Sequence, residues 1–513
     1  MDLAVNKEMV TINDVIFDGV TELPVESDFM LPDYCPDILR ILKCNLLPVV
    51  TSHQSTGEKL IVDGMAVFKI IYISEDDSVR NYEHKIPFSK TVNLKNNVDS
   101  PIITASASSN YVNCRAVSHR RLDARGAIGL SIRAVAQHNE EIMCSASGKE
   151  IELRKKKVKL SPAVGSVFRQ FAVREELELG GGKPRIVHIV NKKVCVQLTD
   201  CKVIANKIIL KADLKVGLLY ISDLDTRSLH RCDFSLPTSQ VIDIDGVDEN
   251  CRCSVVLSVQ SCDIELRPDM DDEGCALDFE AMIGADIKVY CHRELMAVSD
   301  LYSTEYETSF ETRPVALENL TNIIDETYTE INEFEMPDED IEDICDVWGD
   351  GTIRNCQITS NGLVISSLLK ICMLAINSEG KVQYYERVID SEFVTDIGDI
   401  NGNMVSNCSI QIMNCEFEIT QDKEVKIACE VNVQASIFTQ TRENFIFDVR
   451  VNEETVKDHA DQPALTIYYA DASESIWEIA KKYNTSVTEI LEQNAIDDEI
   501  LKSRQMLLIP IRK

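Results

Sequence analysis

The sequence PDILRIL at residues 36–42, followed by the apolar run LIVDGMAVFKIIYIS at 60–74, decides how this chain is organised. Related pairs of segments recur twice further along. The motif counterparts are PRIVHIV at 184–190 and EDIEDIC at 339–345, and the counterparts of the run lie at 208–222 and 363–377. Self-similarity of this kind predicts an internal repeat, and chance similarity between apolar strands is the alternative.

The spacing between copies supports the repeat. Ile38 and Ile186 are 148 residues apart, and Ile73 and Ile221 are also 148 residues apart. Both landmarks recur 155 residues later, in the third copy. Two landmarks that keep one gapless register indicate that each copy is a whole structural unit.

The second half of each copy holds two further strand-like runs. They lie at 111–117 and 127–136, at 253–266 and 276–291, and at 408–419 and 424–438. Apolar residues alternate with polar ones in these runs, as in Val425, Ile427, Cys429, Val431 and Val433, and β-branched residues are frequent. We therefore expect a mainly β chain with three repeated sandwich-like or barrel-like modules, each of about 130–150 residues.

The domain boundaries follow from these modules and from the composition of the segments between them. We expect module 1 and its N-terminal segment at 1–153, module 2 at 158–312, an acidic lead-in with module 3 at 318–450, a polar linker at 451–463, and a small final domain at 464–513. The basic run RKKK at 154–157 suggests a solvated linker or, more sharply, a docking patch. Residues 318–350 hold 13 acidic residues and no Lys or Arg, which suggests an extended connector or a strip that docks a basic partner.

Composition excludes several classes of protein. The net charge of −33 argues against binding to nucleic acid or to an anionic membrane, because phosphate groups would be repelled. No apolar run approaches the ~18 residues of a transmembrane helix, and the N-terminus has no signal-peptide pattern, so we expect the chain to stay where it is made. The 18 cysteines are scattered without a Cys-x-x-Cys pair, so we expect reduced core residues, with a disulfide or zinc framework as the alternative.

Motifs for catalysis are missing from the sequence. The Gly-Lys pairs have no glycine at the spacing of a phosphate-binding loop, and the eight histidines form no metal-binding or catalytic spacing. We therefore expect no enzyme, no catalytic or metal-binding residues and no cofactor. A hydrolase hidden in the β modules is the alternative.

The last fifty residues carry a pattern of their own. Ser475 with Glu478, and Ser486 with Glu489, have the spacing of a capping box at the start of a helix. Ile476, Ile479, Ala480 and Tyr483 fall on one face of the first helix. Short strand-like runs at 465–469 and 506–509 flank the two helices. The pattern predicts a β-α-α-β unit.

This unit resembles a LysM domain. The family motifs appear as Ser-Ile-Trp at 475–477, Ile-Ala at 479–480, Ile-Leu at 490–491, Asn494, and QMLLIP at 505–510. Family members typically bind N-acetylglucosamine polymers in a groove between two loops. Here Ser473-Glu474 replaces the family's Gly-Asp, and Arg504 replaces a glycine, so side chains and charge would crowd that groove.

The resemblance therefore implies a protein-binding face in place of a glycan-binding groove. The residues that we expect to form it are Ser473, Glu474, Ser475, Trp477, Asn494, Arg504 and Gln505. Two roles stay open for Trp477. It could pack in the core of the small domain, or it could be an exposed anchor in an interface, where Trp is enriched.

The remaining chain resembles the SPOCS domain, a module of spore-coat-associated proteins, on its PDILRIL motif and the strands that follow. The likeness is good in module 1, fair in module 2 and weak in module 3, where Glu339 stands in place of Pro184. SPOCS modules with a terminal LysM domain imply a coat morphogenetic protein of the mother-cell cytoplasm, located at the forespore surface. The implied partner of the LysM domain is stage IV sporulation protein A, the coat ATPase, and the modules would contact other coat proteins or each other. The alternative is a peptidoglycan-binding protein of the cell wall or cortex.

Overall fold

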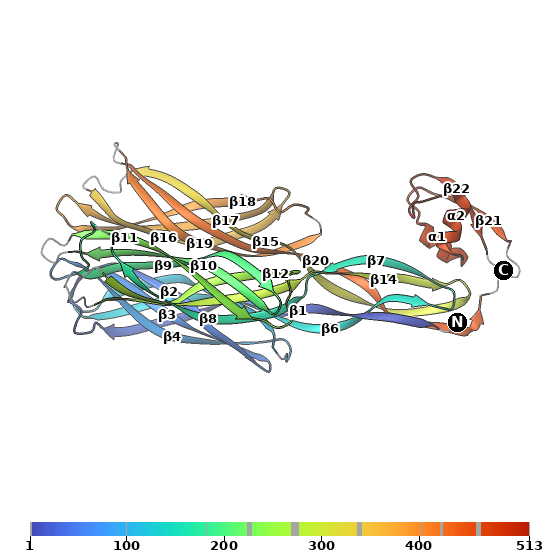
Figure 1. The fold of residues 1–513 in the computed structure, drawn as a ribbon, viewed down its shortest axis with the longest axis horizontal. Helices are drawn as coiled ribbons and strands as arrows, with labels where there is room; N and C mark the ends of the chain where they lie inside the picture. Colours follow the sequence, from blue (N-terminus) through green and yellow to red (C-terminus); the bar gives the residue numbers. More distant parts are fainter. Residues whose placement is uncertain are drawn as a thin grey trace.

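A computed structural model describes residues 3–98, 100–180, 182–222, 228–267, 276–335, 341–400, 402–420, 424–457 and 463–511. These residues form 22 β-strands and two short helices, so the fold is mainly β, as predicted. The molecule is elongated: stacked sheets fill one end, a narrower stalk extends from them, and the small C-terminal domain lies at the far end of the stalk (Figure 1). None of the helices in the described ranges has the length and apolar character needed to cross a membrane.

The first six strands of the chain form two three-stranded antiparallel sheets. One has the order β1-β6-β5, and the other is the meander β2-β3-β4. The bounds are β1 (Ala4–Met30), β2 (Ile38–Thr56), β3 (Lys59–Ser74), β4 (Val79–Asn93), β5 (Ile102–Ala116) and β6 (Arg121–Ser147).

The same connectivity occurs twice more. The second sheet pair has the orders β12-β13-β8 and β11-β10-β9, and the third has β15-β20-β19 and β16-β17-β18. The second pair consists of β8 (Ala163–Glu178), β9 (His188–Ile204), β10 (Lys207–Ile221), β11 (Leu229–Asp243), β12 (Cys251–Leu266) and β13 (Ala276–Cys291). The third consists of β15 (Tyr306–Glu335), β16 (Ile341–Thr359), β17 (Gly362–Asn377), β18 (Val382–Thr395), β19 (Asn403–Ile419) and β20 (Glu424–Val456). We propose that each sheet pair is one of the three modules.

The strand positions keep the register found in the sequence. The middle strands β3, β10 and β17 begin at Lys59, Lys207 and Gly362, and these starts are separated by the same two offsets as the sequence landmarks. Inward-facing side chains alternate along these strands; in β3, Val62 and Phe68 are fully buried. The middle strand of each meander is thus covered by the opposing sheet of its own pair.

The three sheet pairs also share a core with one another. Nine buried side chains form it, three from each pair: Ile71, Ile73 and Val79; Val190, Leu219 and Ile221; Trp348, Cys372 and Leu374. Contact between equivalent positions, such as Ile71, Leu219 and Leu374, indicates an approximately threefold arrangement within one chain. Burial of this apolar surface holds the pairs together.

A tyrosine ties the repeat motif to its strand in the first two pairs. The hydroxyl of Tyr72 donates a hydrogen bond to the carbonyl oxygen of Pro36 at 3.2 Å, and that of Tyr220 donates to Pro184 at 3.0 Å. The third pair has the buried Ala375 at the equivalent position, so this bond is absent there.

We expect Tyr220→Phe to lower the free energy of unfolding by about 1 kcal/mol, because it removes one hydrogen bond and leaves the ring in place. Urea denaturation of the full chain measures the change. Tyr34→Phe is the matched control, since Tyr34 is exposed, and it should change nothing. Equal stability of Tyr220→Phe and the unmodified chain would show that the bond is dispensable.

The stalk consists of three two-stranded ribbons, one continuing from each sheet pair. Residues 4–13 of β1 pair with 137–147 of β6, and residues 306–318 of β15 pair with 440–456 of β20. The third ribbon is β7 (Ile151–Leu160) with β14 (Arg293–Ser303). The three ribbons share a core in the stalk, to which each of the six strands contributes two buried residues: Val10, Ile12, Ile142, Cys144, Val158, Leu160, Leu295, Ala297, Val315, Leu317, Phe445 and Phe447.

The stalk corrects the expected linkers. The basic run at 154–157 is part of β7, where Lys156 pairs with Glu443 and Lys157 pairs with Glu294 at 2.7 Å. Residues 451–456, expected to open a linker, are the last part of β20. Too few apolar residues alternate in these segments to mark them as strands, and their ribbon partners supply the burial.

The acidic stretch is also a strand and not a connector. Residues 318–335 continue β15, and 341–350 open β16, while 336–340 lie outside the described residues. Neighbouring polar groups use the carboxylates as acceptors: Asn432 donates to Asp325 at 2.7 Å, and the amide of Gln440 donates to Glu318 at 2.8 Å. These contacts stabilise acidic side chains of β15 within its sheet.

The expectation of reduced cysteines is wrong for two pairs. The structure has disulfides between Cys201 and Cys253 and between Cys251 and Cys291. Pairs of this kind join residues that are distant in sequence, so their spacing along the chain carries no signal.

Candidate functional site

The C-terminal domain has the predicted β-α-α-β order. Its elements are β21 (Leu465–Ala470), α1 (Ile476–Tyr483), α2 (Val487–Asn494) and β22 (Gln505–Pro510), and the two strands pair antiparallel. Ile476, Ala480, Ile490, Leu507 and Ile509 are fully buried between the helices and the sheet. The small core therefore uses the helix faces that the sequence indicates.

The helix starts were predicted correctly, but the capping hydrogen bonds were not. Ser475 and Ser486 are the N-cap residues of α1 and α2, with extended backbone, yet neither side chain makes the cap hydrogen bond. The hydroxyl of Ser475 is buried and finds no hydrogen-bond partner within the described ranges. Its backbone bridges to Ile500 instead, so a second loop occupies the space at the start of the helix.

Two loops meet at the expected groove. The amide of Ser473 donates to the carbonyl of Leu501 at 2.8 Å, and the amide of Leu501 donates to the carbonyl of Glu474 at 3.0 Å. Ser473 has φ of +75°, a left-handed conformation that favours glycine, which agrees with the glycine of the family motif. Arg504 pairs with Asp471 at 3.1 Å, and both side chains are exposed. The two loops are thus joined by backbone hydrogen bonds and by one exposed ion pair.

Glu474 fixes the conformation of the first loop. Its carboxylate accepts hydrogen bonds from the hydroxyl of Tyr468 at 3.0 Å and from the amide of Asp471 at 2.8 Å. The bond to Glu474 raises the pKa of Tyr468 above its usual value, because ionised tyrosine could not donate it. Glu474 is therefore committed to the loop and only half-exposed.

Two further predicted site residues hold the domain together. Asn494 donates to the carbonyl oxygens of Ile490 and Leu508, at 2.8 Å and 2.7 Å, and accepts from the amide of Leu508 at 2.7 Å. Gln505 pairs with Ala470 in the β21–β22 ladder. These contacts place Asn494 between α2 and β22, where it has few atoms left for a partner.

Trp477 attaches the small domain to the stalk. Its side chain is only 3% exposed, and its indole N–H donates to the carboxylate of Asp300, on β14, at 2.8 Å. Lys481 pairs with the same carboxylate at 2.7 Å, and the ring of Tyr302 lies edge-on to the indole at 5.1 Å. Trp477 is therefore a buried residue and not an exposed anchor. It packs in the core of the small domain and also against the stalk.

The junction contains more than this cluster. The hydroxyl of Tyr302 donates to the carbonyl of Thr485 at 2.7 Å, and burial raises the pKa of Tyr302 well above its usual value. Lys457 donates to the carbonyl of Ser303 at 2.8 Å and to the side chain of Asn484 at 2.6 Å. Sequence reasoning missed Asp300 and Tyr302, since both belong to β14 and lie far before Trp477 along the chain.

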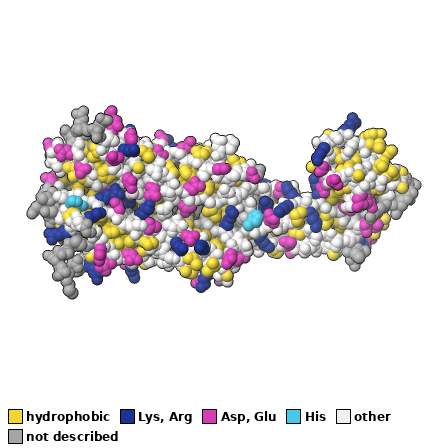
Figure 2. Space-filling view, turned by 45° about the horizontal axis from the view of Figure 1, so that its top comes forward, with side chains coloured by type: hydrophobic (Ala, Val, Ile, Leu, Met, Phe, Trp, Pro, Cys, Tyr) yellow, Lys and Arg dark blue, Asp and Glu magenta, His cyan; other side chains and the backbone are white. Residues whose placement is uncertain are grey.

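A second surface was also missed in the sequence. Leu465, Ile467 and Tyr469 alternate along β21 and are exposed, as is Met506 opposite Tyr469 on β22. We call these four residues the apolar strip. Hydrophobic side chains gather on one side of the C-terminal domain (Figure 2). An exposed apolar patch of this kind is typical of an interaction surface, and the alternation at 465–469 was its signal.

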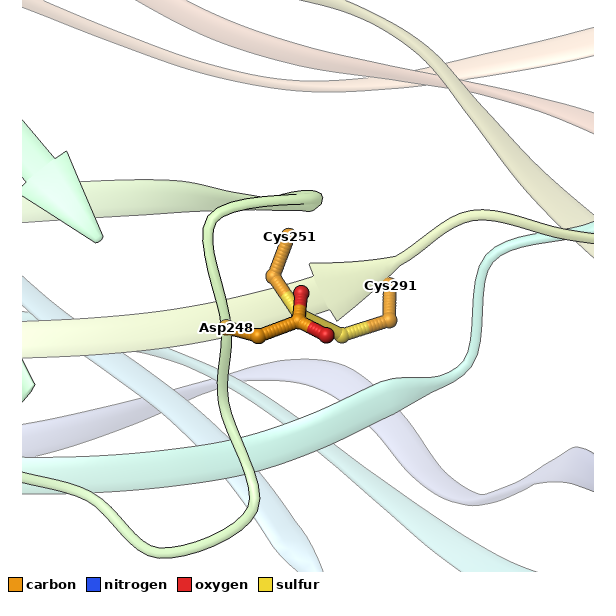
Figure 3. Close-up of side chains that lie close together, drawn as sticks. All are labelled: Asp248, Cys251 and Cys291. Carbon is orange, nitrogen blue, oxygen red and sulfur yellow. A yellow bond between two sulfur atoms is a disulfide. The ribbon is translucent and has the colours of Figure 1, made fainter. Parts of the chain in front are cut away.

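One cluster of side chains among the described residues has the composition of a possible metal site. Asp248, Cys251 and Cys291 bring a carboxylate and two sulfurs within 4.8 Å of one another (Figure 3). The two sulfurs are bonded to each other in the disulfide, so neither is a thiolate. One carboxylate remains, which is too few ligands for zinc or calcium.

Comparison with known families gives two matches. A model described as SipL, SPOCS domain matches residues 37–116 and 185–267, and a LysM domain model matches residues 472–510. The starts of the two SPOCS segments, 37 and 185, keep the offset that separates the strand starts Lys59 and Lys207. No curated protein and no solved structure matches the chain.

Proposed function

We propose that this chain, which combines two SPOCS-domain segments with a C-terminal LysM domain, is a non-enzymatic adaptor in spore-coat assembly. This domain combination is the observation that carries the proposal, since both families are non-catalytic modules linked to binding. The described residues add no constellation for general acid–base or nucleophilic chemistry.

The finer part of the proposal concerns the partner. The LysM domain would bind stage IV sporulation protein A, the coat ATPase, in the mother-cell cytoplasm at the forespore surface. The modules would contact other coat proteins or further copies of this chain and so help to encase the forespore. Several weak contacts to a polymerised partner would add up through effective concentration.

The surface features of the LysM domain favour a protein partner over a glycan. The Arg504–Asp471 ion pair joins the two loops that bind glycan in the LysM family, and Ser473 adds a side chain at the glycine position. The apolar strip lies on the outer face of the sheet and offers the exposed aromatic and aliphatic side chains that protein interfaces use. Peptidoglycan binding remains the second candidate because of the LysM match itself.

Two surface variants separate these candidates. We expect Tyr469→Ala and Arg504→Glu each to weaken capture of the purified coat ATPase about 10-fold, the effect of losing one interface side chain of about 1.4 kcal/mol. Val388→Ala, an exposed apolar position on β18, is the matched control and should bind normally.

Binding of both the ATPase and N-acetylglucosamine oligomers is measured on the full chain by surface-immobilised titration. Oligomer binding that Arg504→Glu abolishes, with no capture of the ATPase by the unmodified chain, would replace the adaptor proposal with the peptidoglycan one.

A further inference from the structure

Cysteine pairs occupy the same place in two of the sheet pairs. The disulfide Cys201–Cys253 joins β9 to β12. The equivalent positions of the third copy are Cys356 on β16 and Cys408 on β19, and their sulfurs lie 2.9 Å apart as free thiols. The repeat therefore places a second pair where the first is already bonded.

The first sheet pair differs from the other two. His53 and Ala105 stand at the positions equivalent to Cys201 and Cys253, so no disulfide can form there. The second and third modules each bring two cysteines together between their second and fifth strands.

These pairs connect the two sheets of their modules. The second strand belongs to the meander sheet and the fifth to the other sheet, so no ladder of backbone hydrogen bonds joins them. Cys415 and Cys429 differ, because they face each other within one sheet, across the β19–β20 ladder. A covalent bond between the second and fifth strands would add a link that the sheet hydrogen bonds do not supply.

The thiols of the third pair suit oxidation. Cys356 accepts a hydrogen bond from Cys408 and another contact from Ser406 at 3.2 Å, which together lower its pKa to about 6. A thiolate is the nucleophilic form of cysteine, and it is populated here near neutral pH. Both side chains are partly exposed, whereas Cys232 and Cys372 are fully buried thiols.

We propose that Cys356–Cys408 is a disulfide-forming site that joins the two sheets of the third module when the protein meets hydrogen peroxide, at the position that the Cys201–Cys253 disulfide occupies in the second module. The Cys356 thiolate attacks one peroxide oxygen, the O–O bond breaks, and the released hydroxide takes a proton to form water. The sulfur of Cys408 then attacks the sulfenic acid sulfur as its thiol proton leaves, the S–O bond breaks, and the released hydroxide takes that proton to leave as a second water. Two thiols lose two electrons in total, and one peroxide gains them.

The bond would lock the third module without changing its fold. The Cys356–Cys408 bond closes a loop as long as that of Cys201–Cys253, with a sequence separation of 52 in both. A bond across a long loop restricts the unfolded chain more than the folded one. The oxidised adaptor would therefore resist unfolding better than the reduced one.

Peptide mapping of the full chain tests the proposal. The reduced protein is treated with a small molar excess of hydrogen peroxide, alkylated and digested without reductant. We expect a linked peptide for Cys356–Cys408, and a thermal midpoint several degrees above that of the reduced protein. Before oxidation, Cys356 should be alkylated at neutral pH about 10-fold faster than Cys372, because only the thiolate reacts.

Matched variants complete the test. In Cys356→Ser/Cys408→Ser we expect the linked peptide of the third module to disappear, and part of the gain in thermal midpoint with it. Cys372→Ala should keep the linked peptide. Recovery of Cys356 and Cys408 as alkylated thiols after peroxide treatment, or in bonds between chains, would overturn the proposal.

Discussion

Phe445→Ala will lower the free energy of unfolding by about 3–5 kcal/mol, the cost of deleting a buried aromatic ring and leaving a cavity. Phe445 is completely buried at the centre of the stalk, among side chains from all six of its strands. A two-stranded ribbon is marginal in water by itself, so each ribbon depends on the shared core. The stalk should therefore lose its packing before the sheet pairs do.

Urea denaturation monitored by circular dichroism gives the overall loss, and amide hydrogen exchange shows where it falls. We expect faster exchange in β7 and β14 and unchanged exchange in β3, which lies in the first meander. Val456→Ala is the matched control, since it lies on the same strand and is largely exposed. Equal stability of Phe445→Ala and this control would mean that the ribbons do not support one another.

The second large effect concerns the junction between stalk and LysM domain. Trp477→Ala removes a buried indole and its hydrogen bond to Asp300, and we expect it to destabilise the LysM domain by about 3–5 kcal/mol. Trp477→Ala also leaves a cavity in the core of the LysM domain, so loss of folding and loss of attachment to the stalk would occur together. Asp300→Ala distinguishes the two effects, because Asp300 lies in the stalk and not in the LysM domain.

In Asp300→Ala we expect a folded LysM domain that no longer stays on β14. Lys481 and the indole N–H lose their shared acceptor, so the indole becomes exposed to water. The emission of Trp477, read in a Trp348→Phe background, should shift to longer wavelength. Asp243→Ala, an exposed carboxylate on β11, should leave the emission unchanged. An unshifted spectrum in Asp300→Ala would show that the contacts of Tyr302 and Lys457 are sufficient for attachment.

The repeat was accessible from sequence because apolar landmarks such as Ile38 and Ile186 are buried and their spacing is preserved. The stalk could not be predicted from sequence. β7 reads IELRKKKVKL, and its few apolar residues are buried only because β7 pairs with β14, which follows the whole second sheet pair in the chain. The acidic strand β15 was misread for a similar reason. Its carboxylates are stabilised by Asn432 and Gln440, which lie on the distant strand β20.

The LysM domain shows the same division between local and distant information. Local patterns located both helices and the N-cap serines, since helix ends depend on neighbouring residues. The environment of Trp477 depends on Asp300 and Tyr302, and no periodicity near Trp477 points to them. The alternation of Leu465, Ile467 and Tyr469 indicates that these side chains share one face of β21, and this face is exposed.

The threefold arrangement of sheet pairs lies within a single polypeptide, and this distinguishes it from a ring of identical subunits. In such a ring, one substitution changes every subunit, so a contact site cannot differ from its symmetry mates. Here the third module has replaced the tyrosine of the other two by Ala375 without changing them. The outward faces of the three modules can therefore carry three different sets of side chains. One molecule can then offer a separate binding surface to each of three different neighbours, with one copy of each surface per molecule.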